Sequence, residues 1–94
     1  MNNIEKYKIV RPPINKETFE MPNKQEIENL QIDSIVKVMF VEKNKHIERM
    51  WCKIKDITED GYITAILINE PIYLSLHSRD IVKFHVTDII AVCR

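Results

Sequence analysis

One stretch of the chain decides the fold: Glu48-Arg-Met-Trp-Cys-Lys-Ile-Lys-Asp-Ile57, then Thr58-Glu-Asp-Gly61, then Tyr62-Ile-Thr-Ala-Ile-Leu-Ile68. Two runs rich in β-branched and apolar residues flank a turn that ends in Asp-Gly. This dipeptide between apolar runs is typical of a β-hairpin, because glycine readily adopts the positive φ that tight turns require. We therefore predict two antiparallel strands, Glu48–Ile57 and Tyr62–Ile68, joined at Gly61.

Apolar runs on either side extend this hairpin into a sheet. We predict three further strands, over Ile35–Val41, Ile72–Leu76 and Ile81–Val86, and a single helical turn over Thr87–Ile90. Asn69-Glu70-Pro71 ends the strand before it, because proline cannot donate a hydrogen bond to a strand ladder. Five short strands joined by tight turns are typical of a small barrel or rolled sheet.

The first residues form a different kind of segment. Residues 1–16 contain Pro12-Pro13, which fixes φ and removes donors, and this predicts an extended arm. Tyr7 and its apolar neighbours would lie along a surface or form an edge strand. Residues 17–94 then form a single β-rich domain, because 94 residues leave no room for two separate cores.

A helix signal precedes the first predicted strand. Asn23 and Glu26 have the spacing of a capping box, so we predict a short amphipathic helix over Asn23–Leu30. The strand Tyr62–Ile68 is apolar on both faces, and we expect this helix and the arm to cover its second face. The predicted fold is therefore α+β and mostly β, a five-stranded antiparallel barrel-like or rolled sheet with one short N-terminal helix.

Charge and cysteine content narrow the classes of function. Fourteen Lys and Arg balance fourteen Asp and Glu, which argues against a dedicated nucleic-acid binder. The longest run without charged residues, Gly61–Asn69, falls far short of the roughly 20 residues of a membrane helix. Cys52 and Cys93 form no CxxC motif, and we expect free thiols in a chain without a signal peptide. These features predict a cytoplasmic protein with no membrane association.

The sequence has no recognisable set of catalytic or metal-binding residues. A single glycine excludes the Gly-rich loops that bind phosphates and dinucleotides. The three histidines lack a second ligand at short spacing, so we expect no metal and no other cofactor. Cys52 would be a nucleophile only beside a base, and its place in the strand predicts a buried thiol instead. We therefore predict that the protein is not an enzyme.

Two groups of residues are candidates for binding. Alternation along Glu48–Ile57 places Arg49, Trp51 and Lys53 on one face together with Lys55. A tryptophan among cations can stack on bases or ligand rings. We favour the alternative that Trp51 packs under the arm or the helix, because large aromatic side chains in small domains are usually structural.

The second group is Asn69, Glu70 and Pro71. Turn chemistry accounts for two of them, since asparagine tolerates the left-handed region and proline fixes the start of the next segment. Glu70 has no such duty in the sequence. It would either form an ion pair with Arg49 or contact a partner, and we favour the structural alternative.

Four segments of the chain form a combined pattern: Leu30…Val36-Lys37-Val38-Met39-Phe40, Glu48-Arg49-Met50-Trp51-Cys52-Lys53-Ile54, Leu67-Ile-Asn69-Glu70-Pro71, and Leu76…Asp80-Ile-Val82-Lys-Phe84-His85. This pattern, over roughly residues 18–90, resembles a small bacterial domain family of unknown function. That family is related to domains assigned as immunity proteins in polymorphic-toxin loci. The resemblance implies a β-rich fold and, through the immunity label, a protein partner.

Two of these segments also resemble each other. Leu30–Val38 and Leu76–Phe84 each contain a leucine, a polar turn with an aspartate, and then Ile-Val-Lys. The shared pattern predicts a turn that starts a strand. The family has glycine where this chain has Asp33 and Arg79, so either these turns differ in shape or Arg79 carries modest strain.

We therefore predict a non-enzymatic protein-interaction module, of the immunity type, that binds a protein partner. The alternative is a small-barrel nucleic-acid or ribosome-associated protein that uses Arg49, Trp51, Lys53 and Lys55 as a cationic, stacking strip. Monomer and homodimer stay open, because the strand Ile81–Val86 and the arm are both potential sheet edges.

Overall fold

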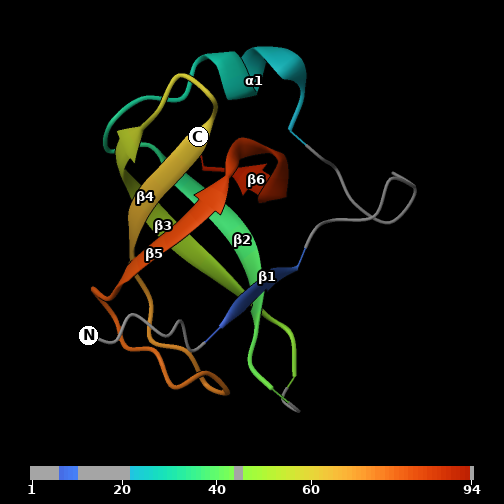
Figure 1. Ribbon diagram of the computed structural model, residues 1–94, viewed down its shortest axis with the longest axis vertical. Helices are drawn as coiled ribbons and strands as arrows, with labels where there is room; N and C mark the ends of the chain where they lie inside the picture. The colour runs from blue at the N-terminus through green and yellow to red at the C-terminus, as the bar shows by residue number, and fades with distance from the viewer. Residues whose placement is uncertain (1–6, 11–21, 44–45, 94) are drawn as a thin grey trace.

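The computed structural model describes residues 7–10, 22–43 and 46–93 (Figure 1). The elements follow in the order β1 (Lys8–Val10), α1 (Lys24–Glu28), β2 (Ile35–Val41), β3 (Glu48–Ile57), β4 (Tyr62–Leu67), β5 (Ile81–His85), a 3₁₀ turn (Val86–Asp88) and β6 (Ile89–Val92). Within these ranges no helix has the length and apolar character needed to span a membrane.

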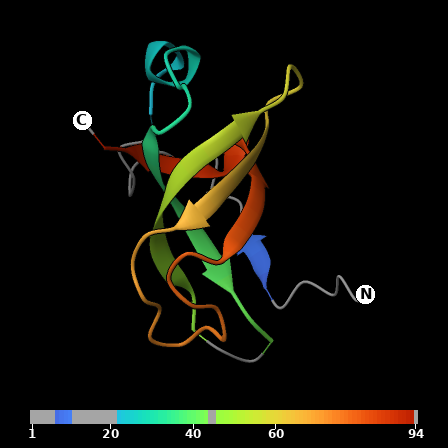
Figure 2. The ribbon, with the colours of Figure 1, turned by 90° about the vertical axis from the view of Figure 1, so that its left-hand side faces the viewer.

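The strands form one curled antiparallel sheet. β1, β2, β3, β4 and β5 are neighbours in that order, and β6 also pairs with β2. β1 pairs with Met39–Val41 and β6 with Val36–Val38, so these two short strands share one edge of β2. The sheet curls into a half-barrel that does not close (Figures 1 and 2). The prediction of a mostly β, rolled antiparallel sheet with one short helix is confirmed at this level.

The core fills the concave side of the curled sheet. Alternate residues of β2 to β5 point inward and are buried: Val36, Val38, Phe40, Met50, Cys52, Ile54, Ile63, Ala65, Leu67, Val82 and Phe84. Tyr7 reaches this core from the start of β1, with its ring edge-on to Phe40 at 5.2 Å between centroids. Its hydroxyl accepts a hydrogen bond from the Lys83 amide at 2.9 Å. Tyr7 thereby links the β1 side of the half-barrel to β5 across the open side.

The helix forms where the capping signal predicts it. The Asn23 Oδ1 accepts from the Glu26 amide at 2.8 Å, and the Glu26 carboxylate accepts from the Asn23 amide at 3.1 Å. α1 ends at Glu28, before the predicted end at Leu30. Ile27 packs against the core from one end of the curled sheet. The prediction that this helix covers the second face of β4 is therefore wrong, because α1 covers the end of the sheet (Figure 1).

The predicted fourth strand, Ile72–Leu76, is also wrong. Residues 68–80 form an irregular loop between β4 and β5. Alternate residues of this segment, Leu74 and Leu76, are nevertheless both buried in the core. The amides of Ile72, Tyr73 and Ser75, however, donate to carboxylate side chains and not to a neighbouring strand.

The predicted helical turn near the C-terminus is shorter than expected and begins one residue earlier, as a 3₁₀ turn over Val86–Asp88. The chain then forms β6, Ile89–Val92, which the sequence analysis missed. At the other end, the edge-strand alternative for the arm is confirmed by β1. The rest of the predicted arm 1–16 lies outside the described residues.

The two turns with matching sequence have matching structure. Asp33 and Arg79 both adopt left-handed backbone conformations, with φ of 76° and 78°. The Asp33 amide donates to the Ile54 carbonyl at 2.8 Å, and the Arg79 amide donates to the Leu67 carbonyl at 2.7 Å. Both positions therefore require the conformation that favours glycine, and Arg79 carries the strain expected of a large residue there.

Candidate functional site

The outer, convex face of β3 brings together the first group of predicted binding residues. Met50, Cys52 and Ile54 point into the core and have no exposed surface. Arg49, Trp51 and Lys53 occupy the alternate positions and therefore lie on the outer face. The alternation predicted for this strand is confirmed.

Strand register places other side chains beside these three. Trp51 lies opposite Lys37 of β2, whose Nζ is 4.7 Å from the centroid of the indole ring. On the other side, the backbone of Trp51 accepts a hydrogen bond from the Ile68 amide at 3.0 Å, just beyond the end of β4. Trp51 thus lies between Lys37 on β2 and Ile68 just beyond the end of β4.

A second row of outer residues lies one step along the same strands. Lys53 is opposite Ile66 of β4, and Ile66 is opposite Ile81 of β5. Ile81 is 66% exposed and Ile68 is 40% exposed. We call the six residues of these two rows the outer-face patch: Lys37, Trp51, Lys53, Ile66, Ile68 and Ile81.

The favoured alternative placed Trp51 under the arm or the helix. Trp51 does not lie under α1, and the arm apart from Tyr7–Val10 lies outside the described residues. The Trp51 side chain is half-buried on the outer face, with Lys37 over its ring. α1 sits at the end of the sheet, and β1 pairs with the far edge of β2. None of the described elements therefore covers the outer-face patch.

The cationic strip predicted along β3 is shorter than expected. A β-bulge lies between Ile54 and Asp56, where the register of β3 against β4 shifts. Lys55 falls at this irregularity, and its ammonium lies 3.5 Å from the carboxylate of Asp33. After the bulge the outer position opposite Thr64 is occupied by Asp56, so an acidic residue follows Lys53.

Asn69 is not one of the six patch residues, but it supports the patch structurally. Its side-chain oxygen accepts a hydrogen bond from the Trp51 amide at 3.0 Å. Together with the bond from the Ile68 amide to the Trp51 carbonyl, this extends the pairing of β3 beyond the end of β4. Asn69 therefore fixes the backbone from which the indole ring projects.

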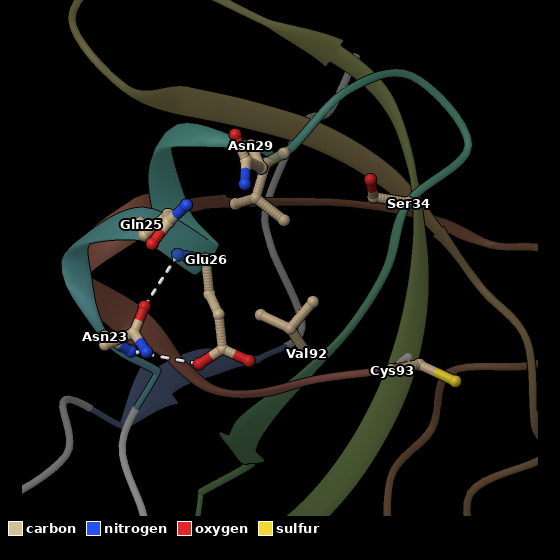
Figure 3. A pocket seen from close by; sticks show the side chains of 8 residues that line it. Asn23, Gln25, Glu26, Asn29, Ser34, Val92 and Cys93 are labelled. Carbon is tan, nitrogen blue, oxygen red and sulfur yellow. Dashed lines mark hydrogen bonds between the residues drawn. The ribbon is translucent and has the colours of Figure 1, made fainter.

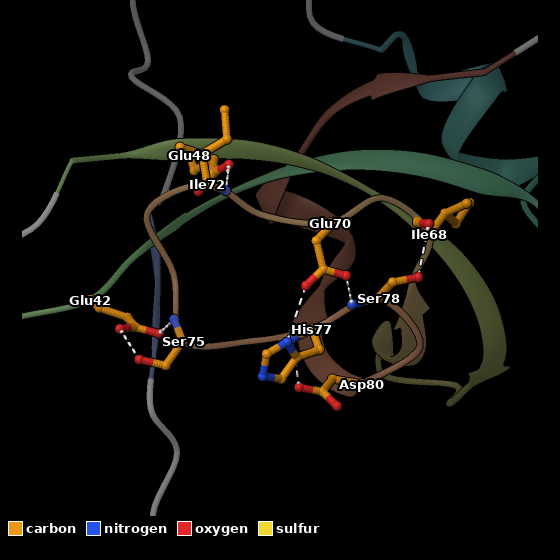
Figure 4. A network of polar contacts seen from close by, with 9 residues as sticks. All are labelled: Glu42, Glu48, Ile68, Glu70, Ile72, Ser75, His77, Ser78 and Asp80. Atoms are coloured by element: carbon orange, nitrogen blue, oxygen red, sulfur yellow. Dashed lines mark hydrogen bonds and ion pairs between the residues drawn. The ribbon is translucent and has the colours of Figure 1, made fainter.

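Glu70 holds the loop that follows. Its carboxylate accepts from the Ser78 amide at 3.0 Å and contacts the His77 ring at 3.1 Å (Figure 4). The hydrogen bond from Ser78, followed by the contact with His77, lowers the pKa of the Glu70 carboxyl. Glu70 therefore has a structural role in the loop through Ser78 and His77, which are not the Arg49 partner that the sequence suggested. Pro71 beside it is half-buried.

Two further carboxylates anchor the same loop. Glu48 accepts from the amides of Ile72 at 2.6 Å and Tyr73 at 2.9 Å, and Glu42 accepts from the amide and the hydroxyl of Ser75 (Figure 4). These carboxylates take the place of a neighbouring strand. Sequence analysis missed them because the two partners of each contact are 24 to 33 residues apart.

The two cysteines lie in different environments. Burial raises the pKa of the Cys52 thiol to about 12, so it stays protonated and is a poor nucleophile near neutral pH. Cys93 is exposed. Among the residues that the structure describes, no group of three His, Cys, Asp or Glu side chains converges to hold a metal ion.

A depression of about 460 Å³ lies between α1 and the end of β6 (Figure 3). Its lining is mixed, with Leu30 and Val92 beside polar helix residues. The Glu26 carboxylate on its wall is engaged by the helix cap. This depression therefore offers neither an apolar floor nor a cluster of charges, and the outer-face patch is the stronger candidate.

Comparison of the chain with protein-family models gives no match, and comparisons with curated proteins and with solved structures give none either. The resemblance to immunity-type domains therefore stays a prediction. The function has to be argued from the geometry of the outer-face patch.

Proposed function

We propose that this protein is a non-enzymatic protein-interaction module that binds a partner protein through the outer-face patch. The observation that carries the proposal is the cluster of Trp51, Ile66, Ile68 and Ile81 on a sheet face that no described element covers. Contiguous exposed apolar side chains on a small domain mark interaction sites. A partially exposed tryptophan is among the residues that contribute most to binding energy at protein interfaces.

The free edge of β5 supports docking on the face of the sheet in preference to its edge. Alternate amides of β5 point away from β4, where an added strand would bind them. The Lys83 amide donates to the Tyr7 hydroxyl, and the His85 amide donates to the Asp88 carboxylate, both at 2.9 Å. A partner strand would have to displace these bonds, so the edge is protected.

The immunity-type role is part of the proposal. A domain of this kind would bind its partner stoichiometrically and block it by occupying a functional surface. It would act in the cytoplasm, where Cys52 and Cys93 remain the free thiols that they are in the structure.

A second candidate is a small nucleic-acid or ribosome-associated binding protein. Trp51 with Lys37, Lys53 and Arg49 nearby favours it, because stacking and phosphate contacts need such residues. Lys37, however, already lies over the indole ring, where a base would have to stack. The three isoleucines make no favourable contact with phosphate groups. The equal numbers of basic and acidic residues also lower the long-range attraction to a polyanion.

The proposal is tested by an affinity pull-down with three versions of the tagged chain: wild type, Ile81→Lys and Ile32→Lys. Ile32 is the matched control, because it is 52% exposed, lies in the turn before β2 and is not one of the six patch residues. Losing the burial of an isoleucine costs about 1.5–3 kcal/mol, or roughly ten- to hundredfold in affinity.

We expect wild type and Ile32→Lys to retain one stoichiometric protein at high salt and after nuclease treatment. Ile81→Lys should lose it. Equal retention by both variants would contradict the assignment of the patch. Loss of every bound species on nuclease treatment would favour the nucleic-acid candidate.

A further inference from the structure

The charges of the chain are unevenly distributed over its surface. The whole sequence is neutral, with fourteen basic and fourteen acidic residues. The described outer positions of β2 to β5 nevertheless hold three lysines, Lys37, Lys53 and Lys83, against the single acid Asp56. The outer face is therefore locally basic in a neutral protein.

Three other acids of the chain bind the loop that follows β4. Glu42, Glu48 and Glu70 accept hydrogen bonds from backbone amides of the loop between β4 and β5 (Figure 4). Their carboxylates are therefore occupied by amides of that loop. The patch combines an apolar centre with lysines that outnumber the acid at the described outer positions.

We propose that the partner of the outer-face patch is a protein surface with Asp and Glu residues around an apolar centre. This inference rests on the proposed function and names the chemistry of its partner. Three lysines around Trp51 and three isoleucines are complementary to such a surface. Because the outer side of a curled sheet is convex, the matching surface is a concave one (Figure 2).

A second copy of the chain does not have this chemistry. A two-fold contact through the same face would bring one lysine-bearing face against another. Like charges facing each other across an interface are unfavourable. The charge of the patch therefore points to a different protein.

The experiment uses a display library of random 12-residue peptides as the probe. The library is panned on the folded wild-type chain, and enriched peptides are synthesised. Trp51 is the only tryptophan in the chain, so its fluorescence reports binding of tryptophan-free peptides at the patch. We expect enriched peptides to combine Asp or Glu with large apolar residues and to shift the Trp51 emission.

Charge-reversal variants then test the role of the cations. Lys37→Glu with Lys53→Glu should weaken peptide binding at least tenfold, and the milder Lys37→Gln with Lys53→Gln should weaken it less. Lys24→Glu is the control, because the Lys24 side chain is 90% exposed on α1, and it should leave the affinity unchanged. Thermal unfolding of each variant shows whether it folds.

Several results would overturn the inference. These are enrichment of neutral or basic peptides, no enrichment at all, or equal weakening by Lys24→Glu. Light scattering shows whether the chain forms a dimer. A dimer that dissociates in the Lys37→Glu, Lys53→Glu variant would mean that the patch binds a second copy of the chain and not a different protein. If the peptide experiment fails but wild type still retains a protein that Ile81→Lys does not retain, the proposed function stands. Only the inference that the partner surface is acidic is then rejected.

Discussion

Removal of the Tyr7 hydroxyl tests how the open side of the half-barrel is held. The change is Tyr7→Phe, which keeps the ring against Phe40 and deletes only the oxygen that accepts from the Lys83 amide at 2.9 Å. This bond joins residues 76 positions apart. It links the residue before β1 to β5 across the open side of the half-barrel.

The expected loss of stability follows from the environment of this bond. A hydrogen bond contributes about 0.5–1.5 kcal/mol net, and a buried amide left without a partner costs about 1–3 kcal/mol. The contact is only part-buried, so water partly satisfies the released amide. We therefore expect Tyr7→Phe to lower the free energy of unfolding by about 1–2 kcal/mol, and Tm by about 4–8 °C for each kcal/mol.

Urea unfolding of wild type, Tyr7→Phe and Tyr62→Phe measures this effect. Tyr62 is the matched control, because its side chain is 60% exposed and its loss of a hydroxyl should change stability by less than about 0.5 kcal/mol. Amide exchange of Lys83 should accelerate only in Tyr7→Phe. Equal stability of the two variants, with unchanged Lys83 exchange, would refute the role given to Tyr7.

Three further predictions concern single residues. In the native protein one thiol per chain, Cys93, should react with a thiol reagent, and Cys52 should react only in denaturant; two fast thiols would contradict its burial. The lowered pKa of Glu70 means that its ionised carboxylate stabilises the folded state at pH values above the ordinary carboxyl pKa. This stabilisation is lost as the pH falls through the lowered pKa. Glu70→Gln should therefore flatten the acid side of a urea-midpoint profile below about pH 5, and an unchanged profile would count against the loop contacts. Gly61→Ala should destabilise the fold by about 1–3 kcal/mol, because the φ of Gly61 is +90° and the added Cβ would lie 2.9 Å from a histidine ring. Arg79→Gly should not destabilise it, because Arg79 has a positive φ that glycine adopts without strain. A lower urea midpoint for Arg79→Gly than for Gly61→Ala would contradict this account of the turns.

Local patterns predicted the central part of the sheet. The Asp-Gly turn and the alternation of Glu48–Ile57 identified the β3–β4 hairpin and the face that carries Trp51. The capping signal at Asn23 located the start of α1. These features depend on residues close together in the chain, so a single sequence contains them.

The errors come from contacts between distant residues. Ile72–Leu76 has the alternation of a strand, but Glu48 and Glu42 bind its amides from the opposite hairpin. β6 was missed because a short run, Ile89–Val92, becomes a strand only through its pairing with β2. Neither outcome has a signal in the neighbouring sequence.

The candidate site was predicted in part for the same reason. Alternation placed Arg49, Trp51 and Lys53 together, but the isoleucines beside them depend on the register of β3 against β4 and β5. The sequence also suggested that a helix would cover this face. α1 is only five residues long and lies at the end of the sheet, and the outer side of β4 stays partly exposed.

The most direct test of the interaction module is photo-crosslinking from the outer-face patch in the cells from which the protein comes. A photoreactive amino acid is placed at Ile81 in one version of the chain and at Ile32 in another, since both side chains are more than half exposed. The proposal predicts one specific crosslinked protein from position 81 and none of it from position 32. Equal crosslinking from both positions, or none from position 81, would contradict the assignment of the outer-face patch as a partner-binding surface.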